Sequence, residues 1–170
     1  TRWADAVGTG KSLQWPVGMG AKGNPGVAGT IKQTEGAIGY IGSEYALAQK
    51  IQTAKVQNSS GNYIEPSIAS VSAAAKGVIP DDTRIMLTNS DDAEAYPISG
   101  FTWIILYKEQ NYNGRTKDQA LATVSFLDWL VSAEAQGEAE KVHYAPLPDA
   151  AAQKAKAILR AVTFDGETLL

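Results

Sequence analysis

AYPISGFTWIILYK, residues 95 to 108, is the only long apolar run in the chain. Its three consecutive aliphatic residues, flanked by aromatic ones, favour a strand buried on both faces over a helix too short to be stable. Pro97 and Gly100 lie at its entrance, where the backbone can bend. We therefore expect a crossover near residues 94–100, where the chain leaves one lobe and enters another.

The composition is that of a globular protein. The 170 residues are 44% hydrophobic and 19% charged, and no window reaches the roughly 18 apolar residues that a membrane-spanning helix needs. The net charge of -3 is spread evenly along the chain, which argues against a nucleic-acid partner. The absence of cysteine excludes disulfides and a cysteine nucleophile, and His143 alone leaves little room for a zinc site or a Ser-His-Asp triad.

Residues 7–23, VGTGKSLQWPVGMGAKG, resemble two kinds of phosphate-binding loop and satisfy neither. A Walker loop requires a glycine where Asp5 stands ahead of Lys11-Ser12. Gly18 to Gly23 have the G-x-G-x-x-G spacing, but Trp15-Pro16 interrupts the strand that a dinucleotide site needs before it. The sequence predicts an irregular loop packed against its neighbours.

The remainder of the segment before residue 95 predicts alternating helices and strands. Asn24 is a suitable N-cap, Pro25 suits the first helical position, and Gly36 is a suitable end for that helix. The further elements expected are a short strand at 37–41, a helix at 43–50, a hairpin of 53–57 with 62–65, and a helix at 66–75. This order indicates α/β packing.

Residues 78–94 contain the acidic pairs Asp81-Asp82 and Asp91-Asp92. Such pairs can hold a hard cation, but these lack the alternating ligands and the central glycine of a calcium loop. A solvated connection is the favoured interpretation.

The segment after residue 108 predicts helices. Thr116 should cap a helix ending at Val131, a second helix should span residues 132–141, and Asp149 should cap a last one ending near residue 163. Two prolines make residues 143–148 extended. The inward stripe expected on the first helix is Leu121, Val124, Leu127, Trp129 and Leu130. Trp129 is interpreted as core and His143 as structural.

Taken in order, VGTGKSLQWPVGMGAKGNPGVAGTI, GAIGYI, AYPISGFTWIILYK, FLDWL and YAPLP resemble the phosphate-binding proteins of high-affinity phosphate ABC transporters. The resemblance covers nearly the whole chain but only the carboxyl-terminal half of that family's sequence. It implies an α/β, two-lobed fold of the periplasmic-binding-protein type, here with only the carboxyl-terminal parts of both lobes. Residues 1–94 would be the later part of the second lobe, and residues 95–170 the returning part of the first.

The resemblance also implies a function and its partners. The family binds phosphate non-covalently in an interlobe cleft, without enzymatic chemistry, cofactor or metal, and serves a membrane permease. It is periplasmic or extracellular, in some cases membrane-tethered. The further partner would be the amino-terminal half, in the same chain or as a separate one, since it would cover the apolar faces that this half leaves open. No nucleic-acid partner is implied.

The resemblance assigns no site residue to this chain. The family's phosphate ligands lie upstream of Thr1, so no catalytic, ligand-binding or metal-binding residue is carried over, and Thr9, Lys11 and Ser12 do not replace them. Two alternatives stay open. One is a phosphatase-like or phosphoryl-transfer enzyme on the same scaffold, with the four aspartates as metal ligands; the other is a secreted interaction protein that kept the fold.

Overall fold

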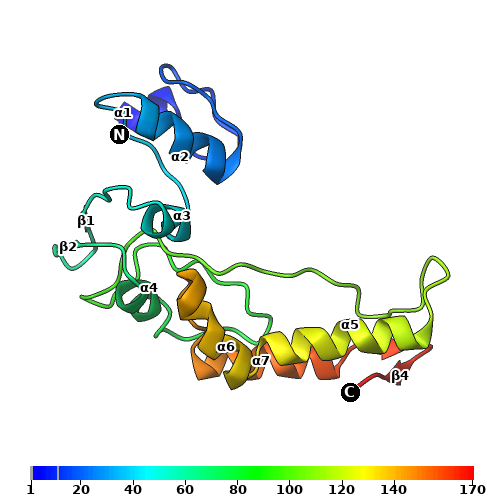
Figure 1. Cartoon of the computed structure of the whole chain (residues 1–170). Helices are drawn as coiled ribbons and strands as arrows, with labels where there is room; N and C mark the ends of the chain where they lie inside the picture. The colour runs from blue at the N-terminus through cyan, green and yellow to red at the C-terminus, as the bar shows by residue number, and fades with distance from the viewer. Residues whose placement is uncertain (1, 11) are drawn as a thin grey trace. The chain divides into compact units, whose positions relative to one another are not determined.

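The computed structural model describes residues 2–10 and 12–170, and Figure 1 shows its elements along the chain. Two compact units are present, Thr1–Ile51 and Gln52–Leu170. Within this chain, residues 52–94 therefore pack with residues 95–170. The lobe boundary predicted near residue 94 concerns the complete two-lobed protein, and it stays a prediction.

The described residues of the first unit form three helices: α1 (Arg2–Ala6), α2 (Gly23–Gln33) and α3 (Ser43–Ala48). Helix α2 begins one residue before Asn24, so the predicted N-cap is wrong. The side-chain oxygen of Asn24 instead accepts a hydrogen bond from the Gly42 N–H at 3.2 Å, which ties α2 to the start of α3. Gly36 follows the helix with φ 72°, a left-handed conformation that suits glycine.

The strand predicted at residues 37–41 does not form. Ile38 is 98% exposed and Tyr40 is also exposed. A strand needs a neighbour for its backbone hydrogen bonds, and the described part of the first unit contains no strand. Gly39 lies close to α2, since a Cβ there would come within 2.9 Å of Ile31 Cδ1.

The second unit opens with the predicted hairpin and helix. Strands β1 (Val56–Gln57) and β2 (Tyr63–Ile64) pair antiparallel, Val56 with Ile64. Between them the buried Asn58 accepts backbone N–H groups of its own turn and donates to the Ala93 carbonyl at 2.9 Å. Helix α4 (Ile68–Ala74) follows, with Ser67 and Ser70 forming a capping box. It packs in a cluster of Ala73, Ala74, Ala75, Leu87 and Ala95.

The later helices lie close to their predicted positions. They are α5 (Lys117–Leu130), α6 (Ala133–Ala139), the 3₁₀ turn η1 (Glu140–Val142) and α7 (Asp149–Arg160). Thr116 caps α5 as predicted, in a capping box with Gln119. Asp149 is not a cap: it is the first helical residue, because the extended Pro148 takes the N-cap position. An acidic residue there still favours the positive end of the helix dipole.

The inward stripe of α5 is narrower than predicted. Val124 is fully buried and packs with Leu159 and Val162, and Leu106 and Leu127 pack against this cluster. Leu121 and Trp129 are exposed, so the core role expected for Trp129 is wrong. The Trp129 ring stacks on the Phe126 ring, with their centroids 5.8 Å apart, and both side chains remain exposed.

The second unit ends in a hairpin that our sequence analysis missed. Strands β3 (Thr163–Phe164) and β4 (Glu167–Thr168) pair antiparallel across Asp165-Gly166. Both turn residues have positive φ, 51° and 80°, as a two-residue hairpin turn of this type requires. The Asp-Gly pair between short β-prone stretches is the signal that predicts it.

Residues 95–108 are not a strand, so the prediction of a strand buried on both faces is wrong for this structure. The run is extended and irregular, and Ile105 is 94% exposed. Its apolar sequence suits a strand, but the described residues offer it no neighbouring strand along its length. Only at its end does Glu109 form a parallel bridge with Thr163.

Candidate functional site

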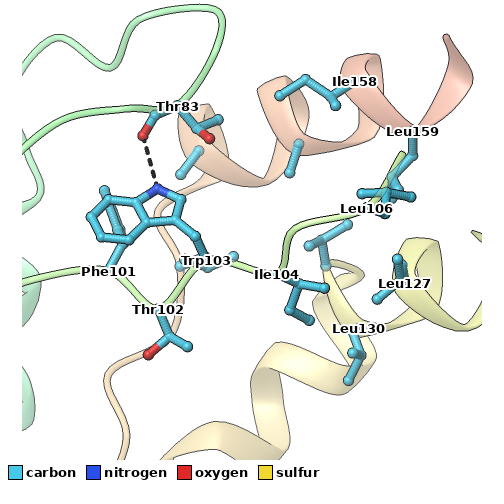
Figure 2. A pocket seen from close by; sticks show the side chains of 14 residues that line it. Thr83, Phe101, Thr102, Trp103, Ile104, Leu106, Leu127, Leu130, Ile158 and Leu159 are labelled. Carbon is cyan, nitrogen blue, oxygen red and sulfur yellow. Dashed lines mark hydrogen bonds between the residues drawn. The ribbon is translucent and has the colours of Figure 1, made fainter. Parts of the chain in front are cut away.

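An apolar groove lies in the second unit between α5, α7 and residues 101–106 (Figure 2). Its volume is about 170 Å³. Fourteen residues line it: Thr83, Phe101, Thr102, Trp103, Ile104, Leu106, Leu127, Leu130, Val131, Leu147, Ala151, Ala155, Ile158 and Leu159. Eleven of these are aliphatic or Phe, so the groove is a surface for apolar contact.

The spacing of apolar residues on each element explains how the groove forms. Leu127 and Leu130 come from α5, and Leu159 comes from α7. Ile104 and Leu106 lie two positions apart on the extended run, so their side chains point to the same side. Figure 2 shows these side chains converging from the three segments.

A short loop is held at one end of the groove. The indole N–H of Trp103 donates to the Thr83 carbonyl at 3.2 Å, drawn as the dashed line in Figure 2. Lys154 on α7 pairs with Asp81 at 2.7 Å. Thr83 has φ 58°, which β-branched residues rarely adopt. The hydrogen bond joins Thr83 to the extended run, and the ion pair joins Asp81 to α7.

The chemistry of the groove does not suit an oxyanion. No charged side chain lines it, and its polar side chains are two threonines and one tryptophan. A desolvated phosphate needs several N–H donors or cationic groups to replace its water. The groove can therefore bury apolar side chains, but it supplies no phosphate site.

Three of the four aspartates considered as metal ligands are engaged elsewhere. Asp81 pairs with Lys154, Asp82 with Arg84 at 2.9 Å, and Asp92 with Lys76 at 3.2 Å. The pKa of Asp82 is lowered by hydrogen bonds from the Arg84 backbone N–H and then from its guanidinium. Across residues 2–10 and 12–170, no three His, Cys, Asp or Glu side chains gather as a metal site would require.

The other sequence candidates form no common site. Thr9 and Ser12 lie in the loop between α1 and α2, while Thr1 and Lys11 fall outside the described residues. Gly18 and Gly23 have φ 110° and 64°, which explains glycine at these positions by backbone geometry. His143 ends η1 in a left-handed conformation. For Gly18, Gly23 and His143 the structure thus gives a local backbone conformation and no shared site.

A polar cluster surrounds Arg115, and no motif in the sequence predicted it. The guanidinium donates to Gln110 Oε1 at 2.6 Å, to the Tyr112 hydroxyl at 3.0 Å and to the Gln119 carbonyl at 3.1 Å, and it also reaches Thr123 Oγ1. Gln110 is fully buried. Since both Nη atoms of its guanidinium donate to groups of the protein, we interpret Arg115 as a structural residue.

Glu109 holds the final hairpin to the end of the apolar run. One carboxylate oxygen accepts the Asn111 and Asp165 N–H groups at 2.8 and 3.1 Å. The other accepts the Thr163 hydroxyl and the Gly166 N–H at 2.8 and 3.2 Å. These bonds, with the Asn111 N–H the strongest and the Thr163 hydroxyl next, lower the pKa of Glu109 from 4.5 to about 2.

We expect Glu109→Gln to destabilise the protein at neutral pH, because an amide nitrogen cannot accept two of these four hydrogen bonds. The lowered pKa means that the carboxylate's contribution is complete above about pH 4.5 and is lost as the pH falls towards 2. The urea midpoints of wild type and variant should therefore differ at pH 7 and converge below pH 4.5. Glu94→Gln, in another exposed loop, is the charge control; a difference that does not depend on pH would contradict the assignment.

Comparison with known proteins identifies the class to which this fold belongs. Residues 5–134 match the model of the PBP superfamily domain, which is well over half of the chain. The chain therefore belongs to the PBP superfamily and has its periplasmic-binding-protein fold, and the predicted α/β fold class is confirmed.

Within this class, the chain is similar to phosphate-binding proteins named PstS. It is 38% identical over 151 residues to that of Xylella fastidiosa (strain 9a5c), covering 86% of this chain and 40% of the relative. The PstS of Pasteurella multocida (strain Pm70) is 34% identical over 174 residues, 99% of this chain and 49% of the relative. The PstS of Methanocaldococcus jannaschii is 32% identical over 162 residues, 86% and 41%. The chain thus spans less than half the length of these relatives.

Proposed function

We propose that this chain is part of a phosphate-binding protein that supplies an ABC transporter for phosphate uptake. The observation that carries the proposal is the similarity to PstS proteins over 86 to 99% of the chain. These relatives are named phosphate-binding proteins, so we propose binding, and not catalysis, for this chain. The four aspartates do not support the enzymatic alternative, since three of them are engaged in ion pairs with Lys76, Arg84 and Lys154.

The phosphate would be held mainly by residues outside this chain. The groove lacks charged side chains, and the hydrogen-bond donors of Arg115 are engaged within the protein. Phosphate capture needs convergent backbone N–H groups, hydroxyls and a cation. We place these in the remaining part of the two-lobed protein, in a cleft that closes non-covalently on the anion.

The exposed apolar side chains support an amino-terminal half as a partner. In the first unit, Trp3 and Trp15 approach edge to face with centroids 5.6 Å apart, and both rings remain about half exposed. In the second unit, Ile105 is almost fully exposed. Apolar surface of this kind is usually covered. In the complete protein, residues 1–94 would belong to the second lobe and residues 95–170 to the first, with the crossover at 94–100.

The location and the transport partner follow from the same proposal. A receptor for phosphate uptake would work in the periplasm or outside the cell, whether free or tethered, and pass phosphate to a membrane permease. In the part of the chain that the structure describes, no helix has the length and apolar character needed to cross a membrane.

Isothermal titration with inorganic phosphate tests the proposal on two proteins. We expect the 170-residue chain to show no binding, and the complete product of the reading frame that contains it to bind one phosphate. Sulfate is the matched control for charge and shape. Absence of phosphate binding by the complete product would overturn the function, whereas tight binding by the 170-residue chain would overturn our placement of the ligands. Turnover of a phosphomonoester would favour the enzymatic alternative.

A further inference from the structure

One exposed turn in the second unit has the sequence Asn113-Gly114. Both residues have positive φ, 51° and 74°, and the Arg115 N–H donates to the Tyr112 carbonyl at 3.0 Å. This geometry is that of a type I′ turn, for which Asn-Gly is a preferred pair. Asn113 is also the only asparagine of the sequence that a glycine follows, so this pair is unique in the chain.

The groups of this pair that could react with each other are free. Among the described residues, none forms a hydrogen bond with the Asn113 side-chain amide or with the Gly114 N–H. A Cβ added to Gly114 would meet no atom within 4 Å, so open space surrounds its backbone. No described strand flanks the turn, so it is closed by the hydrogen bond from Arg115 to Tyr112.

An asparagine that precedes a free glycine N–H can deamidate without an enzyme. The Gly114 nitrogen loses its proton to water and bonds to the side-chain carbon of Asn113, and the side-chain amide leaves as ammonia. Water then opens the resulting cyclic imide at either of its carbonyls. The products are aspartate and isoaspartate, and in isoaspartate the main chain continues through the former side chain. Glycine favours the first step because no Cβ lies beside the attacking nitrogen.

The turn Asp165-Gly166 provides a matched comparison in the same unit. Its residues also have positive φ, 51° and 80°, and an Asp-Gly pair can form the same cyclic imide with loss of water. Here, however, the Asp165 and Gly166 N–H groups donate to the Glu109 carboxylate at 3.1 and 3.2 Å. The Asn111 side chain also donates to the Asp165 carboxylate. These bonds hold the Gly166 nitrogen and the Asp165 side chain in place, which opposes cyclisation.

We propose that Asn113-Gly114 is a site of spontaneous deamidation, and that Glu109 protects the similar Asp165-Gly166 turn from the same cyclisation. Water is the co-reactant and phosphate takes no part, so this proposal does not depend on the proposed function. Isoaspartate at position 113 lengthens the main chain between Tyr112 and Arg115. It therefore disturbs the hydrogen bond that closes the turn and the placement of Arg115 beside Gln110.

Peptide mapping of an Asp165→Asn variant of the complete product tests the proposal with the same chemistry at both turns. After incubation at mildly alkaline pH, tandem mass spectrometry measures deamidation at each position, in the folded protein and in the protein unfolded in urea. Asn113 should react at most about tenfold more slowly in the folded protein, because a single turn hydrogen bond limits it. The asparagine introduced at position 165 should be slowed at least about 100-fold, because several bonds must open together.

Glu109→Gln, added to this variant, is the control for the protecting carboxylate. It should raise the rate at position 165 at least about tenfold and change the rate at Asn113 far less. Slowing of Asn113 by more than about tenfold on folding overturns the proposed site, whether the turn stays closed or additional chain covers it. Equal slowing at the two positions without Glu109→Gln, or equal acceleration with it, overturns the protecting role of Glu109.

The effect of isoaspartate on Arg115 can be measured on aged wild-type protein. The deamidated fraction, isolated by ion exchange, should unfold at a lower urea concentration than an Asn113→Asp variant. Both carry the new negative charge, but only the aged protein contains isoaspartate, which lengthens the main chain. Equal midpoints would overturn the predicted disturbance of Arg115.

Discussion

Leu159→Ala is expected to lower the free energy of unfolding by about 3 kcal/mol. Leu159 is 5% exposed and packs with the fully buried Val124 and with Val162, where α7 meets α5 and the end of the chain. Removing its side chain loses apolar burial and leaves a cavity that the helices cannot fully close. Urea unfolding followed by far-UV circular dichroism gives the measurement.

Ile158→Ala is the matched control for this prediction. It removes a similar volume from the neighbouring position of α7, but Ile158 is 38% exposed at the side of the groove. Its loss should therefore be about 1 kcal/mol in the 170-residue chain. Equal losses for the two variants would show that the cluster around Leu159 is not a close-packed core.

Arg115→Met is expected to destabilise the protein by about 2 kcal/mol, the second large effect. The substitution keeps much of the aliphatic stem but leaves the Oε1 atom of the buried Gln110 without its guanidinium donor. An unpaired buried acceptor retains its full desolvation cost, which is larger than the net value of an ordinary hydrogen bond. The free energy of unfolding in urea measures this cost.

A second arginine supplies the control for lost charge. Arg84 pairs with Asp82, but its side chain is 83% exposed, so Arg84→Met should change the free energy of unfolding by less than about 1 kcal/mol. If Gln110→Leu in the Arg115→Met background fails to recover stability, the unpaired amide is not the cause. That result would contradict our interpretation of the cluster.

The elements that could be predicted are those whose signals are local. Thr116 with Gln119 forms a capping box within four residues, and the Ser132 hydroxyl accepts the Ala135 N–H at the start of α6. The β1–β2 hairpin forms around a turn of Asn, Ser and Gly residues. In each case the atoms that decide the structure lie a few positions apart, so the sequence is sufficient.

The predicted features that failed depend on distant atoms. Asn24 has the chemistry of a helix cap, but its oxygen bonds to Gly42, 18 residues later. The stretches 37–41 and 95–108 have strand composition, but a strand exists only where another strand pairs with it. Apolar composition therefore predicted a tendency to form strands, and the available neighbours determined whether strands formed.

At the candidate site, too, features set by neighbouring residues could be predicted, and features set by distant residues could not. The absence of a complete phosphate-loop motif can be read from the sequence, because Walker and dinucleotide spacings can be checked position by position. It did not indicate the roles of Arg115 or Glu109. Three of the four hydrogen-bond donors to Glu109 lie 54 to 57 residues away, in Thr163, Asp165 and Gly166. Only folding brings such donors to one carboxylate.

The sequence by itself determined most of the helices, the Thr116 cap, the first hairpin and the resemblance to a superfamily that the comparison confirmed. These follow from residue chemistry at short separation and from the order of motifs along the chain. The tertiary structure alone decided which apolar side chains are buried, where the groove lies between α5 and α7, and that Ile105 is exposed. The physical reason is that a side chain is buried, and a strand is paired, only when a second segment packs against it. The local sequence does not specify that second segment.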